Sequence, residues 1–318
     1  MQQLPEIITN FAFINETKTR NMNKTIKSIL KYLQIKAFNP YLKYMNFLSH
    51  LGGGGKLPQE ALPHKLLIIT VAYNTPVLIK KQIELIKKYV EDEDYQLIVA
   101  DNSTQKKYRN VIRQICEEEH TEYIPIPTFI NKLHLHKIFY GGASHGAALN
   151  WIFYHVITPR EPQYFAFLDH DVLPFASSNL QKHIEGKDFY GVDRNKKNGW
   201  YIWPGYCIFN FKSIQKTHPN FLPMYIGKEY FDTGGNNYIQ IYKQHPRMGT
   251  YFAKCETSRF KETEGLMRHD QIYHADCIQF IDDTWVHLIN GSNCAHIKDK
   301  EKTVEKLLKN IYRIQELA

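Results

Sequence analysis

Two aspartates separated by a single residue follow an apolar segment in the middle of the chain. The sequence from Phe165 to Phe175 reads FAFLDHDVLPF, with the carboxylates at Asp169 and Asp171. Alternate residues of a strand point to the same side. Two carboxylates about 4 Å apart repel by roughly 4 kcal/mol at an effective dielectric near 20. A divalent cation removes this cost, and oxygen ligands favour Mg²⁺ or Mn²⁺, which can hold a diphosphate. The pair therefore predicts a metal site, with a solvated turn as the alternative.

Three apolar runs that end on polar residues predict the strands that position this pair. They cover residues 65–74 (KLLIITVAYN), 95–101 (YQLIVAD) and 164–168 (YFAFL, directly before Asp169). Apolar side chains at helical spacing follow the first run and precede the third. This alternation predicts an α/β fold with a mostly parallel central sheet and helices on both faces. In such sheets ligands bind at the carboxyl ends of the strands, where Asn74, Asp101 and Asp169 are expected.

A glycine-rich segment precedes the helix before the third strand. It reads GGASHG over residues 141–146. Backbone N–H groups at a helix start can hold a phosphate, and a tight turn before the helix is the alternative. Ala143 occupies a position where the dinucleotide fingerprint needs glycine, so that motif is excluded.

Several further residues are candidates for chemistry, each with a structural alternative. His287, in WVHLINGSN, is a candidate third metal ligand or a structural histidine. Asp232, in YFDTGGNN, is either a helix N-cap or a general base, and Asp270 is the alternative base. Trp200 and Trp203 are either surfaces on which a sugar stacks or members of the core.

The composition is that of a basic, globular protein. The 318 residues carry a formal charge of +8, which favours anionic partners. We interpret the excess of basic residues as spread along the chain, because there is no long Lys/Arg block. Nucleic acid is therefore not an expected partner. Five cysteines without a CxxC motif predict reduced thiols. With no recognisable secretory signal and no apolar run long enough to cross a bilayer, we expect a cytoplasmic protein.

The chain divides into three predicted parts. Residues 1–63 form an N-terminal helical extension with a glycine linker at 52–55, residues 64–298 form the main domain, and residues 299–318 form a C-terminal helix packed on it. Within the main domain, residues 200–211 and 280–289 each predict a strand, and the segment GGNNYIQIYKQH (234–245) predicts a helix that begins after Gly234 and Gly235.

The N-terminal extension contains a basic amphipathic pattern. Apolar residues at helical spacing (Ile26, Ile29, Leu30 and Leu33) lie opposite lysines at 24, 27 and 31. Such a helix either contacts an anionic membrane on its cytoplasmic face or packs on its own domain. The sequence leaves both interpretations open.

Taken together, these motifs resemble the family-2 glycosyltransferases with the GT-A fold, over about residues 64 to 293. ITVAYN is similar to the family's first strand, whose end touches the nucleotide base, and VADNS to the second, whose aspartate holds the nucleoside. GGASHGAALN resembles the loop and helix before the metal strand, and LDHD resembles the metal-binding DxD motif. The nucleotide-binding positions that the resemblance implies are Val71, Ala72, Tyr73, Asp101, Gly142, His145 and Asp169, and the metal positions are Asp169, Asp171 and His287.

The resemblance implies a reaction as well as a fold. A sugar would move from a nucleotide-sugar, expected to be a UDP-sugar, to a glycan or lipid-linked acceptor hydroxyl with inversion, in surface glycan synthesis. Mn²⁺ or Mg²⁺ would stabilise the leaving diphosphate, and Asp232 would be the base, although it lacks the adjacent acid usual in the family. The alternatives are a nucleotidyltransferase that acts on sugar phosphates and a non-catalytic basic binding protein on a degenerate GT-A fold.

Overall fold

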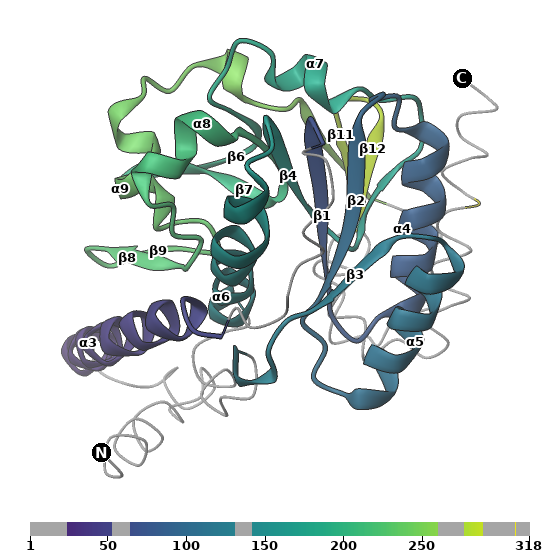
Figure 1. Cartoon of the computed structure of the whole chain (residues 1–318). Coiled ribbons are helices and arrows are strands. Elements are labelled where there is room, and N and C mark those ends of the chain that lie inside the picture. Colours follow the sequence, from purple (N-terminus) through teal and green to yellow (C-terminus); the bar gives the residue numbers. More distant parts are fainter. Residues whose placement is uncertain (1–23, 53–63, 131–141, 260–276, 289–308, 310–318) are drawn as a thin grey trace.

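A six-stranded, mostly parallel sheet forms the centre of the molecule (Figure 1). The computed structural model describes residues 24–52, 64–130, 142–259, 277–288 and 309. In the strand order β3-β2-β1-β4-β7-β6, the first four strands are parallel to one another, and β7 is antiparallel to both β4 and β6. The strands are β1 (Leu66–Ala72), β2 (Tyr95–Asp101), β3 (Glu122–Pro125), β4 (Tyr164–Asp169), β6 (Phe189–Lys196) and β7 (Gly199–Asn210). The predicted α/β class is confirmed.

Helices cover both faces of this sheet, which explains the unbroken apolar strands. Every residue of β1 is buried. On one face, alternate strand residues pack with α4 (Pro76–Tyr89) and α5 (Lys106–Glu118). On the other face they pack with α6 (Gly142–Ile152) and the π-helical turn that continues it. A strand that is buried on both faces needs apolar side chains at successive positions rather than at alternate ones.

A second sheet of four antiparallel strands packs against α4. Its order is β10-β11-β12-β5, formed by β5 (Val172–Pro174), β10 (Cys255–Arg259), β11 (Cys277–Ile281) and β12 (Trp285–Leu288). The prediction of one strand over residues 280–289 is wrong, because the chain reverses between β11 and β12. Asp282 and Asp283 both have positive φ there, 50° and 57°, the backbone that two-residue hairpin turns need.

The predicted N-terminal helix is present as α3 (Lys24–Ser49) and packs on the domain. Its inner residues belong to the same core cluster as α6. They are Phe38, Tyr41, Leu42, Met45 and Leu48. These five residues follow the predicted apolar pattern along the helix. None of the helices in the described ranges has the length and apolar content needed to span a bilayer.

The remaining elements are short. They are α7 (Leu180–Ile184), α8 (Phe211–Ile214), the hairpin β8 (Met224–Ile226) and β9 (Glu229–Phe231), and α9 (Asn237–Gln240). The helix predicted from Gly234 to His245 is shorter than expected, since only α9 and a 3₁₀ turn at Tyr242–Gln244 form. The predicted linker beyond Gly52, Asp270 and the C-terminal helix lie outside the described residues, apart from residue 309, which is helical.

Candidate active site

The carboxyl ends of β1, β2 and β4 meet at one edge of the sheet. In the strand register Val71 lies beside Asp169 and Ala72 beside Asp101. Just beyond β1, Asn74 fastens this edge: its N–H donates to Ser103 Oγ (2.8 Å), and its side chain exchanges hydrogen bonds with the segment after β2. The sequence prediction that these polar residues share one edge is confirmed.

The two aspartates of the LDHD segment lie close together and are mostly removed from water. Asp169 ends β4 and keeps 22% of its side chain exposed, whereas Asp171, in the turn before β5, keeps 4%. Burial, together with the charge of Asp171, raises the pKa of Asp169 to about 7. In the described ranges no group of three His, Cys, Asp or Glu side chains is placed to hold a metal ion. The protein thus presents a carboxylate pair whose mutual repulsion a bound cation would relieve.

A buried glutamine from α4 holds the backbone of this turn. Gln82 Nε2 donates to the carbonyl oxygens of Asp169 and Val172, both at 2.8 Å, and its Oε1 accepts a hydrogen bond from the Thr70 hydroxyl at 2.7 Å. Gln82 is fully buried. The clamp fixes both ends of the turn that carries Asp171, so it sets the direction of the carboxylates.

Replacing this clamp should cost stability and loosen the turn. Gln82→Leu keeps a similar volume but leaves two buried carbonyl groups without their donor, and an unsatisfied buried polar group costs about 1–3 kcal/mol. We expect the free energy of unfolding to fall by about 2–4 kcal/mol in urea denaturation. Gln114→Leu, at an exposed position of α5, is the matched control and should change it by less than about 0.5 kcal/mol. Equal effects of the two substitutions would show that Gln82 is not a clamp.

The start of α6 brings His145 and Asp232 to the same place. His145 Nε2 lies 3.3 Å from Asp169 Oδ1, and burial lowers the pKa of His145 to about 4, against the opposing charges of Asp232 and Asp171. Gly142 lies against Asp232, because a Cβ at this position would be 2.3 Å from Asp232 Oδ1 and would displace that side chain. The carbonyl of Gly142 also accepts a hydrogen bond from Thr233 Oγ1 at 3.0 Å.

Asp232 is the exposed carboxylate of the site. It follows β9, and its Oδ1 accepts hydrogen bonds from the Thr233 N–H (2.8 Å) and the Tyr230 hydroxyl (3.3 Å). Its backbone N–H donates to the Tyr201 hydroxyl at 3.2 Å. No side-chain cap to α9 is made in the described structure, so Asp232 does not serve as the N-cap that its position in the sequence allowed.

His287 approaches the other aspartate from β12. Its Nε2 lies 3.8 Å from Asp171 Oδ1, and the N–H of Leu288 donates to the backbone carbonyl of Asp171 at 2.8 Å. Burial lowers the pKa of His287, which favours the neutral imidazole. The Trp203 ring packs on His287 with centroids 4.5 Å apart.

Arg194 is a residue of this site that the sequence did not reveal. Its guanidinium lies over the Trp203 ring, 4.9 Å from the centroid. Its positive charge acts to lower the pKa values of both Asp169 and His287. The Trp203 ring on which it lies also packs on His287, whose Nε2 is 3.8 Å from Asp171 Oδ1. Arg194 belongs to no recognisable sequence motif, so its place beside Trp203 can be found only from the fold.

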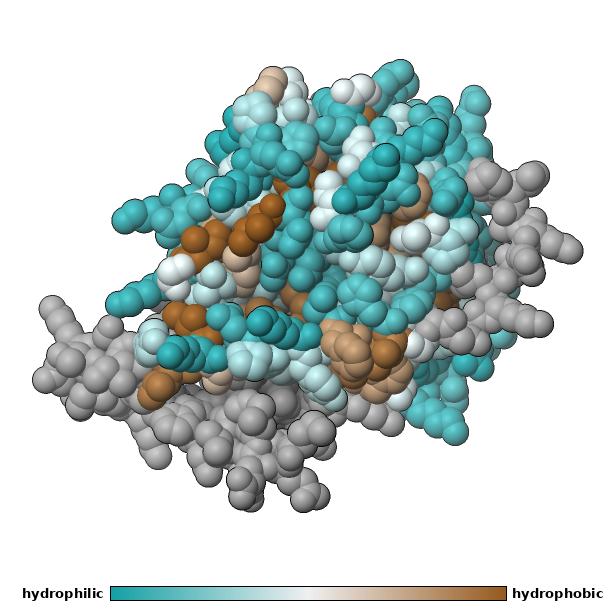
Figure 2. Space-filling model, turned by 60° about the vertical axis from the view of Figure 1, so that its left-hand side comes forward, coloured by the Kyte–Doolittle hydropathy of each residue, from teal (hydrophilic) through white to brown (hydrophobic). Residues whose placement is uncertain are grey.

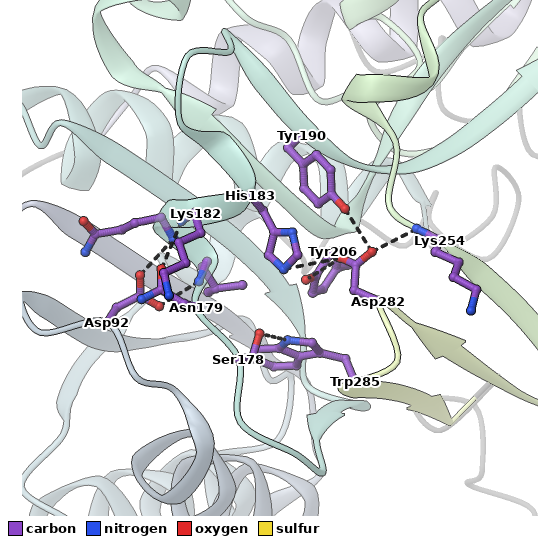
Figure 3. A network of polar contacts seen from close by, with 12 residues as sticks. Asp92, Ser178, Asn179, Lys182, His183, Tyr190, Tyr206, Lys254, Asp282 and Trp285 are labelled. Carbon is purple, nitrogen blue, oxygen red and sulfur yellow. Dashed lines mark hydrogen bonds and ion pairs between the residues drawn. The ribbon is translucent and has the colours of Figure 1, made fainter.

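The hairpin that carries His287 is fixed by a network of polar contacts (Figure 3). The carboxylate of Asp282 accepts hydrogen bonds from the hydroxyls of Tyr190 (2.9 Å) and Tyr206 (3.1 Å) and from the backbone N–H of Lys254 (2.9 Å). Nearby, Trp285 Nε1 donates to Ser178 Oγ at 2.8 Å. These contacts join the second sheet to the first and so hold β12 beside Asp171.

Several residues that were predicted for the site have side chains that are buried or already hydrogen-bonded. Asp101 is fully buried, with one oxygen accepting from the Ser103 N–H and the other from the Tyr123 hydroxyl, both at 2.8 Å. Val71 and Ala72 are buried, whereas Tyr73 is exposed. Trp200 packs in the core, on residues such as Tyr242 and Phe252. Of the two tryptophans, only Trp203 lies beside the carboxylates.

No protein-family model and no curated protein matches this chain. Among solved structures, it is similar to S. aureus TarS (14% identity, TM-score 0.33, 49% of this chain and 30% of that one) and to the galactosyltransferase LgtC in complex with donor and acceptor sugar analogues (14%, 0.33, 47% and 59%). A mannosyltransferase from Pyrobaculum calidifontis, in complex with GDP-Man and Mn²⁺, is similar at 13% identity and a TM-score of 0.34, over 59% and 58%. The chain thus spans less than two thirds of each of these proteins. At these TM-scores the likeness alone assigns no activity.

Proposed function

We propose that this protein is a metal-dependent, inverting glycosyltransferase of the GT-A type that uses a nucleotide-sugar donor. The observation that supports this best is the placement of three aspartates. Asp169 and Asp171 form a mostly buried pair at the end of β4. Asp232, an exposed carboxylate, lies beside Gly142 at the start of α6, three residues from the His145 that contacts Asp169. The charge of Asp232 acts to raise the pKa values of both Asp169 and His145, in agreement with this proximity.

Asp169 and Asp171 would hold the metal ion, Mn²⁺ or Mg²⁺. These ions are often bound by one or two carboxylates, with phosphates of the substrate and water completing the shell, so a complete protein cage is not required. His287, held neutral by burial near Asp171, is the candidate further ligand. The bound ion would stabilise the negative charge of the departing diphosphate.

The donor nucleotide would bind across the ends of β1 and β2. Tyr73 has an exposed ring there. Asp101 stabilises the segment after β2 by accepting a hydrogen bond from the Ser103 N–H. Arg194 would supply a positive charge toward the diphosphate, because its guanidinium lies on Trp203, and Trp203 packs on His287 beside Asp171. Planar guanidinium groups pair well with phosphate oxygens.

Asp232 would act as the general base that removes the proton from the acceptor hydroxyl. Inversion at the sugar carbon needs one such base on the face opposite the leaving group. Because Asp232 is exposed, its carboxylate can contact an incoming acceptor, whereas Asp169 and Asp171 would bind the metal. Trp203 is the candidate stacking surface for a sugar ring, because it is only partly buried at the site.

The test is donor hydrolysis by the full chain. UDP-, GDP- and dTDP-sugars are incubated with the protein in Mn²⁺ or in EDTA, and the released nucleoside diphosphate is measured. We expect slow release from one donor that depends on Mn²⁺, with a UDP-sugar as the expected donor. No release from any donor, together with no thermal shift from any nucleotide, would overturn the proposal in favour of a non-catalytic binding protein.

A parallel assay with nucleoside triphosphates and sugar phosphates, in which pyrophosphate is measured, tests the second enzymatic alternative. A nucleotidyltransferase acting on sugar phosphates would release pyrophosphate from a nucleoside triphosphate instead. The exposed carboxylate Asp232 favours the glycosyltransferase, because nucleotidyl transfer to a phosphate does not require a base that deprotonates a sugar hydroxyl.

A further inference from the structure

The positive charge of this protein is concentrated near its N-terminus, not spread along the chain as the composition suggested. Residues 17–59 contain eight Lys and Arg and no Asp or Glu. The whole chain has 40 basic and 32 acidic residues, so the other residues carry 40 − 8 = 32 basic and 32 acidic side chains. The segment that contains α3 therefore accounts for the entire formal charge of +8.

The outward face of α3 combines this charge with exposed aromatic side chains. We define this face by Tyr32, Lys36, Lys43, Tyr44, Phe47 and Leu51, all exposed. Lys36 Nζ lies 4.8 Å from the centre of the Tyr32 ring. Of the ten large hydrophobic side chains that are exposed in the described ranges, five lie between residues 32 and 51, and Phe47 is the most exposed at 58%. Figure 2 brings the left-hand side of Figure 1 forward and shows hydrophobic patches among hydrophilic side chains on that side of the molecule.

We propose that the outward face of α3 docks on an anionic phospholipid surface. A helix that lies in a membrane interface carries lysines around an apolar face with aromatic residues. The long lysine side chains can reach the headgroups while Phe47 and Leu51 enter the acyl boundary. A nucleic-acid site would use the lysines but would not explain the exposed Phe47, Leu33 and Leu51 beside them. The absence of any acidic residue over the length of the helix removes the repulsion that an anionic surface would otherwise meet.

This surface lies directly behind the element that carries the candidate base. Phe38, on the inner face of α3, packs on Tyr225 and Tyr230 of the β8–β9 hairpin, with ring centroids 5.5 and 6.2 Å apart. Tyr230 in turn donates a hydrogen bond to Asp232. If the proposed sugar transfer is correct, a membrane-bound α3 would hold Asp232 near the bilayer, where a lipid-linked acceptor would present its hydroxyl. Membrane binding itself does not depend on that function.

The test is sedimentation of the full chain with vesicles of phosphatidylcholine alone or mixed with phosphatidylglycerol. We expect binding to the anionic vesicles that weakens as salt is raised. Lys36→Glu with Lys43→Glu should weaken it by roughly 30-fold or more, at about a factor of five to six per lysine contact. Lys106→Glu with Lys107→Glu, at exposed positions of α5, changes the net charge equally and should leave most of the binding. Phe47→Ser should weaken binding even in low salt.

Three results would overturn the proposal. One is equal binding to neutral and anionic vesicles, or none to either. Another is an equal loss of binding in the α3 and α5 charge reversals, which would mean that only net charge matters. A third is tighter binding to RNA or DNA than to the vesicles with Phe47→Ser unchanged, which would assign the face to nucleic acid. Donor hydrolysis in solution, measured in parallel, tests the proposed transferase separately, because the α3 variants should retain it.

Discussion

Asp171→Asn should abolish the metal-dependent release of nucleoside diphosphate while leaving the apo protein at least as stable as before. The substitution keeps the shape of a side chain that is almost fully buried but removes one of the two negative charges at the metal position. Charge stabilisation by a metal amounts to several kcal/mol, so we expect the rate of donor hydrolysis to fall by about 1,000-fold. Without metal, the repulsion with Asp169 disappears, and the melting temperature should stay equal or rise.

The combination of these two effects is what identifies a metal ligand. A structural aspartate would lose stability on substitution, and the metal would still raise the melting temperature. We expect Mn²⁺ to raise the melting temperature of the wild type, as any ligand of the native state does, and to leave that of Asp171→Asn unchanged. Asp188→Asn, at an acidic residue that is half-buried beside His245, serves as the control and should keep the Mn²⁺ shift. A wild-type protein indifferent to Mn²⁺ and EDTA would remove the basis for the metal site.

Asp232→Asn should slow sugar transfer strongly while sparing donor binding. General-base catalysis contributes roughly 10²- to 10⁴-fold, and we expect kcat to fall within that range. The asparagine can still accept the hydrogen bonds from Thr233 and Tyr230, and the position is exposed, so folding should be unaffected. The measurement is transfer to an acceptor under saturating donor, together with the dissociation constant of the nucleotide by calorimetry.

Glu229→Gln gives the matched control on the same hairpin. Glu229 lies three residues earlier, where its carboxylate accepts from the N–H groups of Lys197 and Asn198 rather than facing the site. It should retain nearly full activity. If Asp232→Asn transferred sugar at the wild-type rate, the base would have to lie elsewhere, and Asp270 would become the candidate.

The parallel strands could be predicted from the sequence because their environment leaves a clear signal. β1, β2 and β4 are covered by helices on both faces, so each becomes a run of apolar residues that ends on a polar residue at the sheet edge. The same logic predicts that Asn74, Asp101 and Asp169 lie at one edge of the sheet, as they do. The β11–β12 hairpin escaped notice because two aspartates, instead of a pair such as Asn-Gly, adopt the positive φ angles of its turn.

The supporting residues could not be predicted because their partners are distant in the sequence. Helical spacing places Gln82 on the apolar side of its helix, but nothing in the sequence shows that its partners are Asp169 and Val172, some 90 residues away. The contact that positions Arg194 is with Trp203, which lies on the neighbouring strand β7. Trp200, three residues before Trp203, is a core residue, and nothing in the local sequence distinguishes the two.

Because β5 pairs with β12, the second sheet can form only late in the synthesis of these residues. Val172 lies opposite His287 in this pairing, so the two strands are separated by more than a hundred residues of chain. Strands β1 to β4 leave the ribosome first and can begin to associate, since domains form as their segments become available. The wall beside Asp171 is added only when β12 emerges. A nascent chain would therefore present the carboxyl ends of β1, β2 and β4 well before β12 pairs with β5 beside Asp171.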